Sequence, residues 1–187
     1  MELKFTTKEI TLIALFVALI TIGSKITIPS PIVPFTLQWM FVALSGMLLG
    51  PRLAPITMIV YILLGLMGLP VFTKGGGISY ILSPTFGYLI GFIVASYILG
   101  KAVECMDNEI KFWRIMVAMI GALFVLYGIG VCYMYIVANL YLGKAMAFSS
   151  AIWYGAILFI PTDLLSAILC SILGVRIAHQ VRQIVES

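Results

Sequence analysis

Six long apolar stretches, separated by short polar turns, constrain this chain more than any other feature. Hydrophobic residues make up 63% of the sequence and charged residues 10%, whereas soluble domains average about 25% charged residues. A soluble fold this apolar would lack enough polar groups to cover its surface. The sequence therefore predicts one all-α integral membrane domain over residues 1–187, a bundle of six transmembrane helices at approximately 10–26, 37–49, 53–69, 81–103, 112–137 and 151–177.

The second stretch is short for a crossing, which usually takes about 20 residues. Gly50, Pro51 and Arg52 mark a turn between the second and third stretches. Because proline is favoured in the first turn of a helix, Pro51 and Pro55 are typical of a new helix that starts here. The sequence therefore predicts two separate helices.

Positive charges predict the orientation. With both termini in the cytoplasm, the outer flanks carry only Lys25, Lys74 and Lys144, and the cytoplasmic flanks carry Lys4, Lys8, Arg52, Lys101, Lys111, Arg114, Arg176 and Arg182. This distribution obeys the positive-inside rule. A cleaved signal peptide is the competing interpretation of the first stretch, but it lacks a convincing cleavage site of small residues.

Asp163 is the only charged side chain between Ala151 and Leu173. An ionised carboxylate inside hydrocarbon costs at least a few kcal/mol, so such acids usually face a polar cavity or a partner. The thirteen helical residues between Asp163 and Arg176 rise about 20 Å, and the hydrocarbon core is roughly 30 Å thick. If Arg176 marks the cytoplasmic boundary, Asp163 lies in the outer third of the membrane. We therefore predict a polar binding site there. The alternative is a structural carboxylate bonded to neighbouring helices.

Several classes of function are disfavoured. Gly100-Lys101 and Gly143-Lys144 lack the glycine spacing of a phosphate loop. The three cysteines have no metal-ligand spacing, and the single histidine, His179, lies on the cytoplasmic tail without a nucleophile beside it. The net charge of +4 is spread thinly over the membrane flanks, unlike a nucleic-acid-binding surface. We expect no enzyme, no cofactor and no metal site.

Three further segments carry a signal. Thr73–Thr85 holds Gly75, Gly76 and Gly77, whose backbone N–H groups can approach a ligand closely, but it could be an ordinary outer connection. Gln38, in the string PFTLQ at 34–38, could line a pocket or meet lipid headgroups. Ala14 and Ala18 form an A-x-x-x-A pair, which favours close helix packing, either internal or against a partner.

Together these strings resemble the BioY family, the biotin-specific substrate-capture (S) components of energy-coupling factor (ECF) transporters. The resemblance covers nearly the whole chain and is carried by PFTLQ at 34–38, LLGPRLAP at 48–55, YILLGLMGLPVF at 61–72, the glycine loop, SPTFGYLIGF at 83–92 and FIPTDLL at 159–165. It implies a six-helix membrane fold in a prokaryotic cell membrane. It also implies a high-affinity biotin pocket near the outer face, and partners that comprise a membrane coupling subunit and two ATPase subunits. Ala14 and Ala18 would dock against the coupling subunit.

This chain departs from the family pattern at three positions. Ser166 replaces a lysine that commonly follows the acid, and Ser83 and Phe86 alter the fourth-span motif, whereas Thr85 and Tyr88 match it. Without that lysine, one candidate partner for Asp163 or for the carboxylate of biotin is missing.

The chemistry of biotin suits the resemblance. Asp163 would accept the ureido N–H groups, since charge-assisted hydrogen bonds are stronger than neutral ones. Tyr80 and Tyr88 would form walls for the bicycle. Lys74, Lys144 or the amides of the glycine loop would hold the carboxylate tail. The other readings are a carrier that works without an ATPase, with Asp163 coupled to an ion, and a membrane enzyme or assembly scaffold.

Overall fold

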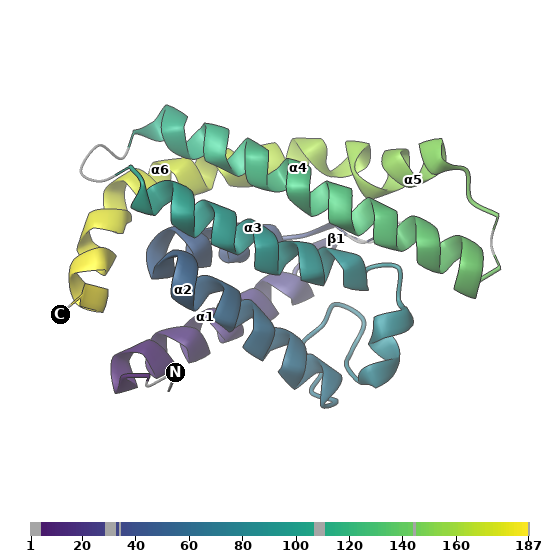
Figure 1. The fold of residues 1–187 in the computed structure, drawn as a ribbon, viewed down its shortest axis with the longest axis horizontal. Helices are drawn as coiled ribbons and strands as arrows, with labels where there is room; N and C mark the ends of the chain where they lie inside the picture. Colours follow the sequence, from purple (N-terminus) through teal and green to yellow (C-terminus); the bar gives the residue numbers. More distant parts are fainter. Residues whose placement is uncertain (1–4, 29–32, 34, 107–110, 144, 187) are drawn as a thin grey trace.

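The protein is a bundle of apolar helices (Figure 1). The computed structural model describes residues 5–28, 33, 35–106, 111–143 and 145–186. Its α-helices are α1 (Thr7–Lys25), α2 (Gln38–Leu66), α3 (Phe86–Glu104), α4 (Phe112–Ile136), α5 (Phe148–Gly155) and α6 (Ile160–Glu186). Among the described residues, five helical segments are long and apolar enough to cross a membrane. The expected all-helical membrane class is confirmed.

Five short elements connect these helices. Two are the strands β1 (Thr27–Ile28) and β2 (Phe35–Thr36), which pair antiparallel. Two are 3-10 helices, η1 (Ile78–Leu82) and η3 (Ile157–Phe159), and the third helical turn, η2 (Val137–Tyr141), is a π-helix. The hairpin β1–β2 joins α1 to α2, and η1 follows the glycine loop.

Helix α2 consists of two helical arms that meet at a kink and run antiparallel to each other. At Gly50 the backbone leaves the helix with φ 76°, a conformation that glycine adopts without strain. The amide of Leu37, just before α2, donates to the carbonyl of Ile26 beyond the end of α1. Arg52, after the kink, lies 3.6 Å from Glu9 at the start of α1. The first arm of α2 therefore runs antiparallel to α1 along the whole length of that helix, and the chain turns back at the kink.

The second arm of α2 returns to the level where the first began. Tyr61 donates from its hydroxyl to the carbonyl of Val71, and Ser24, near the end of α1, donates to the same carbonyl. The two predicted stretches at 37–49 and 53–69 thus correspond to two antiparallel arms. Pro51 begins the second arm, where its missing N–H leaves no helical hydrogen bond unmade.

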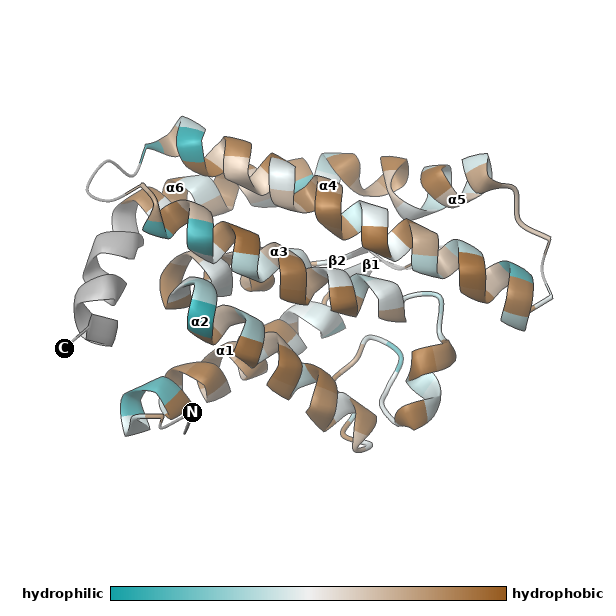
Figure 2. Ribbon diagram, viewed as in Figure 1, coloured by the Kyte–Doolittle hydropathy of each residue, from teal (hydrophilic) through white to brown (hydrophobic). Residues whose placement is uncertain are grey.

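Charged residues gather at one end of the bundle. Figure 2 shows hydrophilic segments where α1 begins, where α3 ends and where α4 begins, with apolar residues covering the helices between. The ion pairs Arg52–Glu9 and Lys101–Glu104 lie at this end. Lys25 lies at the opposite end of α1, where its ammonium donates to the carbonyl of Phe72 over 2.6 Å. This segregation matches the two-sided charge pattern of the sequence.

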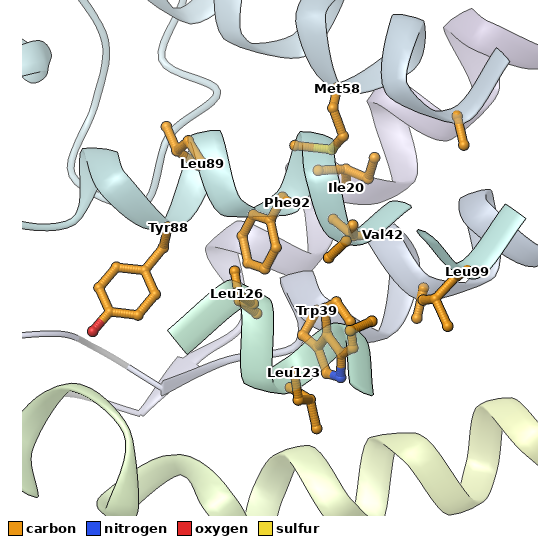
Figure 3. Close-up of a cluster of buried hydrophobic side chains, with 14 of the residues drawn as sticks. Ile20, Trp39, Val42, Met58, Tyr88, Leu89, Phe92, Leu99, Leu123 and Leu126 are labelled. Carbon is orange, nitrogen blue, oxygen red and sulfur yellow. The ribbon is translucent and has the colours of Figure 1, made fainter. Parts of the chain in front are cut away.

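The core lies between the first arm of α2, α3 and α4. Trp39 stacks on Phe92 with ring centroids 6.1 Å apart, and Figure 3 shows Leu126 of α4 beside them. A Cβ added to Gly46 would lie 2.9 Å from the backbone oxygen of Ser96, so small size allows α2 and α3 to approach closely. These contacts hold three helices around the cavity described next.

Candidate functional site

A small buried cavity lies between helices α2, α3, α4 and α6. Its volume is about 70 Å³, room for several waters on a scale of roughly 10–15 Å³ each. Its lining is mostly aromatic and aliphatic, with a few polar groups. It comprises Val33, Thr36, Gln38, Trp39, Tyr61, Phe72, Thr73, Tyr80, Thr85, Tyr88, Leu89, Phe92, Leu126, Tyr127, Phe159 and Asp163.

Asp163 lies in the first turn of α6 because a break precedes it. At Ala156 the backbone is non-helical, and η3 separates α5 from α6. Pro161 explains why the helix restarts here, since proline lacks the N–H that a continuous helix would use and is favoured in a first turn. A carboxylate at a helix N-terminus is stabilised by the unpaired N–H groups and the helix dipole. The break therefore gives a buried acid a favourable position.

Tyr127 of α4 is the hydrogen-bond partner of this acid. Its hydroxyl donates to the carboxylate of Asp163 over 2.5 Å, and the Asp163 side chain is 7% exposed. Among the described residues, no lysine or arginine lines the cavity. Ser166, which replaces the family lysine, donates to the carbonyl of Thr162 instead. The acid is thus supported by a neutral donor rather than by a cation.

Sequence reasoning missed Tyr127. It lies 36 positions from Asp163 along the chain, inside an apolar stretch that contains several tyrosines with no motif around them. The one available signal was its polar hydroxyl at mid-span. Which helix faces pair is a property of the tertiary structure, so the sequence could not single it out.

Two α2 residues that line the cavity carry a buried N–H donor without a partner in the described part of the chain. The donors are Nε2 of Gln38 and Nε1 of Trp39, whose side chains are 4% and 2% exposed. Leaving a buried donor unpaired costs roughly 1–3 kcal/mol. Gln38 is one of the residues that the sequence predicted to bind a ligand, and that role stays a prediction.

An aromatic wall lines the cavity on the side of the segment between α2 and α3. Phe72 packs between Tyr61 and Tyr80, with ring centroids 5.5 and 4.4 Å away. Thr85 donates to the hydroxyl of Tyr80 over 3.2 Å and also contacts the Ser83 hydroxyl. Burial raises the pKa of Tyr80, so its hydroxyl stays protonated and can donate to a ligand. Tyr80 and Thr85, both predicted ligand residues, therefore line this cavity, and their binding of a ligand stays a prediction.

Tyr88 presents its ring to the cavity, but its hydroxyl is already used. The hydroxyl donates to the carbonyl of Gly155 over 2.7 Å. The Tyr88 ring lies so close to Gly130 that an added Cβ would be 2.4 Å from it. Figure 3 shows the side chain extending away from α3. Tyr88 thus contributes an apolar wall and fixes α3 against α4 and α5.

Residues 74–77, the glycine loop within the segment Thr73–Thr85, lie next to the cavity but do not line it. Lys74, Gly76 and Gly77, all predicted ligand residues, are absent from the described lining, whereas Phe72 and Thr73 belong to it. The amide of Gly75 donates to Phe72, and the amide of Gly77 donates to the carbonyl of Gly65 over 2.7 Å. In this conformation these amides bond to the protein, so donation to a ligand stays a prediction that requires the loop to rearrange.

One predicted candidate, Lys144, a proposed holder of a ligand carboxylate, lies outside the described residues. Pro34, the first residue of the string at 34–38, lies outside them as well. Within the described residues, no three His, Cys, Asp or Glu side chains gather as a metal site would require.

Ala14 and Ala18 lie on the exposed face of α1. Ile10 and Ile22, one turn further at each end, are 56% and 53% exposed. Since the pair is exposed, internal packing does not explain it. Because both side chains are small, the pair leaves a shallow depression in the apolar surface of α1.

Comparisons with known proteins agree with one another. The family model described as "BioY family" matches residues 1–183. A protein named probable biotin transporter BioY from Lysinibacillus sphaericus is 42% identical, over 92% of this chain and 87% of that protein. One of the same name from Pyrococcus horikoshii is 34% identical, over 91% of this chain and 96% of that protein.

A solved structure is similar as well. The crystal structure of the S-component for biotin from an ECF-type ABC transporter superposes with a TM-score of 0.79 at 25% sequence identity. The match covers 93% of this chain and 94% of that one.

Proposed function

This chain belongs to the BioY family, and from that premise we propose that it is the biotin-binding membrane subunit of an ECF-type uptake transporter. It captures biotin with high affinity at the outer face of a prokaryotic cell membrane, and an ATP-driven partner complex then drives its delivery inward. The observation that carries the proposal is the buried Asp163–Tyr127 pair in a cavity with an aromatic wall.

The polar groups of the cavity suit a ureido ring. A urea offers two N–H donors and one carbonyl acceptor. Ionised Asp163 is acceptor-only, and Gln38 has an unpaired amide donor in the described part of the chain. Phe72, Tyr80 and Tyr88 supply the apolar surface that a bicyclic ligand needs. The carboxylate tail would then point toward the outer mouth, toward Lys74 and the glycine loop.

Binding requires the walls to move. Pockets that enclose drug-sized ligands measure about 300–1,000 Å³, and this cavity measures about 70 Å³. Ser24 and Lys25 of α1 hold the carbonyls of Val71 and Phe72, just before the glycine loop, so we expect the loop itself to be the segment that opens.

The proposed topology has six crossings with both termini in the cytoplasm. The antiparallel arms of α2 supply two of them, and the position of Arg52 beside Glu9 supports a cytoplasmic turn at Gly50. The exposed Ala14–Ala18 face would dock on the membrane coupling subunit, which works with two ATPase subunits.

Two measurements test the function. Calorimetric titration of the purified chain should give tight binding of biotin, and no heat with a vitamin that lacks the ureido ring. In vesicles, uptake should require the coupling subunit and active ATPases. Binding without that requirement would favour a carrier that works alone, and absence of binding would overturn the proposal.

A further inference from the structure

A second cavity of about 430 Å³ opens on the side of the bundle between α4, α5 and α6. Its wall is almost entirely apolar and includes Phe124, Gly128 and Cys132 of α4, Ile152 of α5 and Ile160 of α6. Phe124 is 80% exposed and Ile160 is 42% exposed, so the groove is open to its surroundings. The lining runs from Ile120 to Cys132, which is about 18 Å along a helix.

The position of this groove identifies what surrounds it. It lies within the segments Phe112–Tyr141 and Phe148–Val175, the two most apolar of the candidate membrane spans. Hydrocarbon is the medium at that depth. Figure 1 shows α4 and α5 on the side of the bundle opposite α1, the helix that carries Ala14 and Ala18. A partner docked on α1 would therefore leave the groove facing lipid.

The groove also touches the candidate biotin site. Tyr127 lines both cavities, and its hydroxyl donates to Asp163. Tyr127 thus borders an apolar groove, while its hydroxyl supports the buried acid. A molecule in the groove would pack against the residue that holds Asp163.

We propose that this groove is a binding site for one acyl chain of a bilayer phospholipid, which packs against the ring of Tyr127. An elongated apolar chain matches the shape and length of the groove, and filling it restores the dispersion contacts that an empty groove lacks. The phospholipid headgroup stays at the membrane surface.

Two glycines of α4 provide a matched test. A Cβ at Gly128 or at Gly121 meets nothing within 4 Å, so either position accepts a larger side chain without a clash. Gly128 lines the groove, whereas Gly121 does not. Gly128→Phe fills the groove, and Gly121→Phe adds the same bulk to α4 outside it.

The probe is phosphatidylcholine with a photoreactive diazirine midway along one acyl chain, in vesicles of unlabelled phosphatidylcholine. After irradiation, mass spectrometry should find labelling of residues 120–132 and 148–164 enriched at least fivefold over the exposed face of α2. Gly128→Phe should remove that enrichment, and Gly121→Phe should keep it within twofold.

Even labelling of all spans in the wild-type protein would overturn the proposal, because only bulk lipid would then be present. Unchanged labelling in Gly128→Phe would overturn it too. Size-exclusion profiles check that each variant folds, and Gly128→Leu replaces the larger substitution if that one fails to insert. None of these readouts involves biotin, so the result is independent of the proposed function.

Discussion

The bond between Asp163 and Tyr127 resolves how a charge is tolerated in an apolar span. A buried carboxylate loses hydration, and this loss must be offset by fixed donors. Here the hydroxyl of Tyr127 and the N-terminus of α6 provide them. Neither carries a formal charge, so Asp163 is not neutralised by a cation lining the described cavity, which is what we expect of an acid that binds a ligand.

We expect Asp163→Asn to weaken biotin binding at least tenfold, about 1.4 kcal/mol. The amide replaces a charged acceptor with a neutral one while it keeps the shape. Calorimetric titration measures the affinity, and Glu104→Gln, which removes an exposed acid on α3, serves as the control. An unchanged affinity would remove Asp163 from the binding site.

Tyr127→Phe should weaken binding less than Asp163→Asn, by about three- to tenfold. It removes one hydrogen bond to a charged group and preserves the ring. Such a bond contributes roughly 1.5–3 kcal/mol to stability, and only part of this free energy affects the affinity for biotin. Tyr97→Phe, at a half-exposed tyrosine of α3, is the control. The double variant should be non-additive, since the two residues act together. Simple additivity would mean that Tyr127 does not act through Asp163.

At the scale of the elements, we expect the exposed alanine pair on α1 to serve partner docking, whereas the cavity serves ligand binding. Ala14→Leu or Ala18→Leu should leave biotin affinity within twofold yet lower uptake at least fivefold, because larger side chains keep a partner helix away. Co-purification with the coupling subunit is the direct measurement. Gly121→Leu adds bulk to α4 on the other side of the bundle and should affect neither property. Normal assembly of both alanine variants would leave this face without a partner.

The glycine loop is the element that we expect to act as a lid. At Gly76 a Cβ would lie 2.1 Å from the carbonyl oxygen of Leu69, so Gly76→Ala must shift the loop. This variant should bind biotin more weakly by threefold or more, whereas Ser79→Ala, at an exposed position, should not. In wild-type protein, biotin should protect residues 73–83 from proteolysis. Equal digestion with and without biotin would rule out a lid.

For the whole molecule, Tyr127 lines both the apolar groove and the cavity that contains Asp163, so we expect the proposed lipid site and the proposed biotin site to be coupled. Wild-type protein in short-chain detergent should bind biotin at least threefold more weakly than after phospholipid is added back. In Gly128→Phe the new side chain takes the place of the acyl chain, so this lipid dependence should disappear, whereas Gly121→Phe should retain it. If the affinity of the wild-type protein does not depend on phospholipid, the two cavities are uncoupled.

Much of the fold follows from the local sequence. Apolar length predicts helices wherever the chain spans hydrocarbon, and Gly50 with Pro51 predicts the turn that divides α2, because only glycine adopts its φ of 76° without strain. Asp163 stands out for the same reason, since a charge in an apolar run is detectable without any partner. Pro161 fixes where α6 restarts. These are properties of single residues and their neighbours along the chain.

The tertiary structure decided which side chains meet. Tyr127 became the partner of Asp163, Gln38 came to line the cavity, and the amides of Gly75 and Gly77 were bonded to Phe72 and Gly65 rather than left free. Helix packing sets these contacts through the rotation and approach of whole helices. In an almost uniformly apolar chain, many rotations bury similar area, so periodicity carries little information about which face turns inward. Residues far apart in sequence therefore meet only once the bundle has formed.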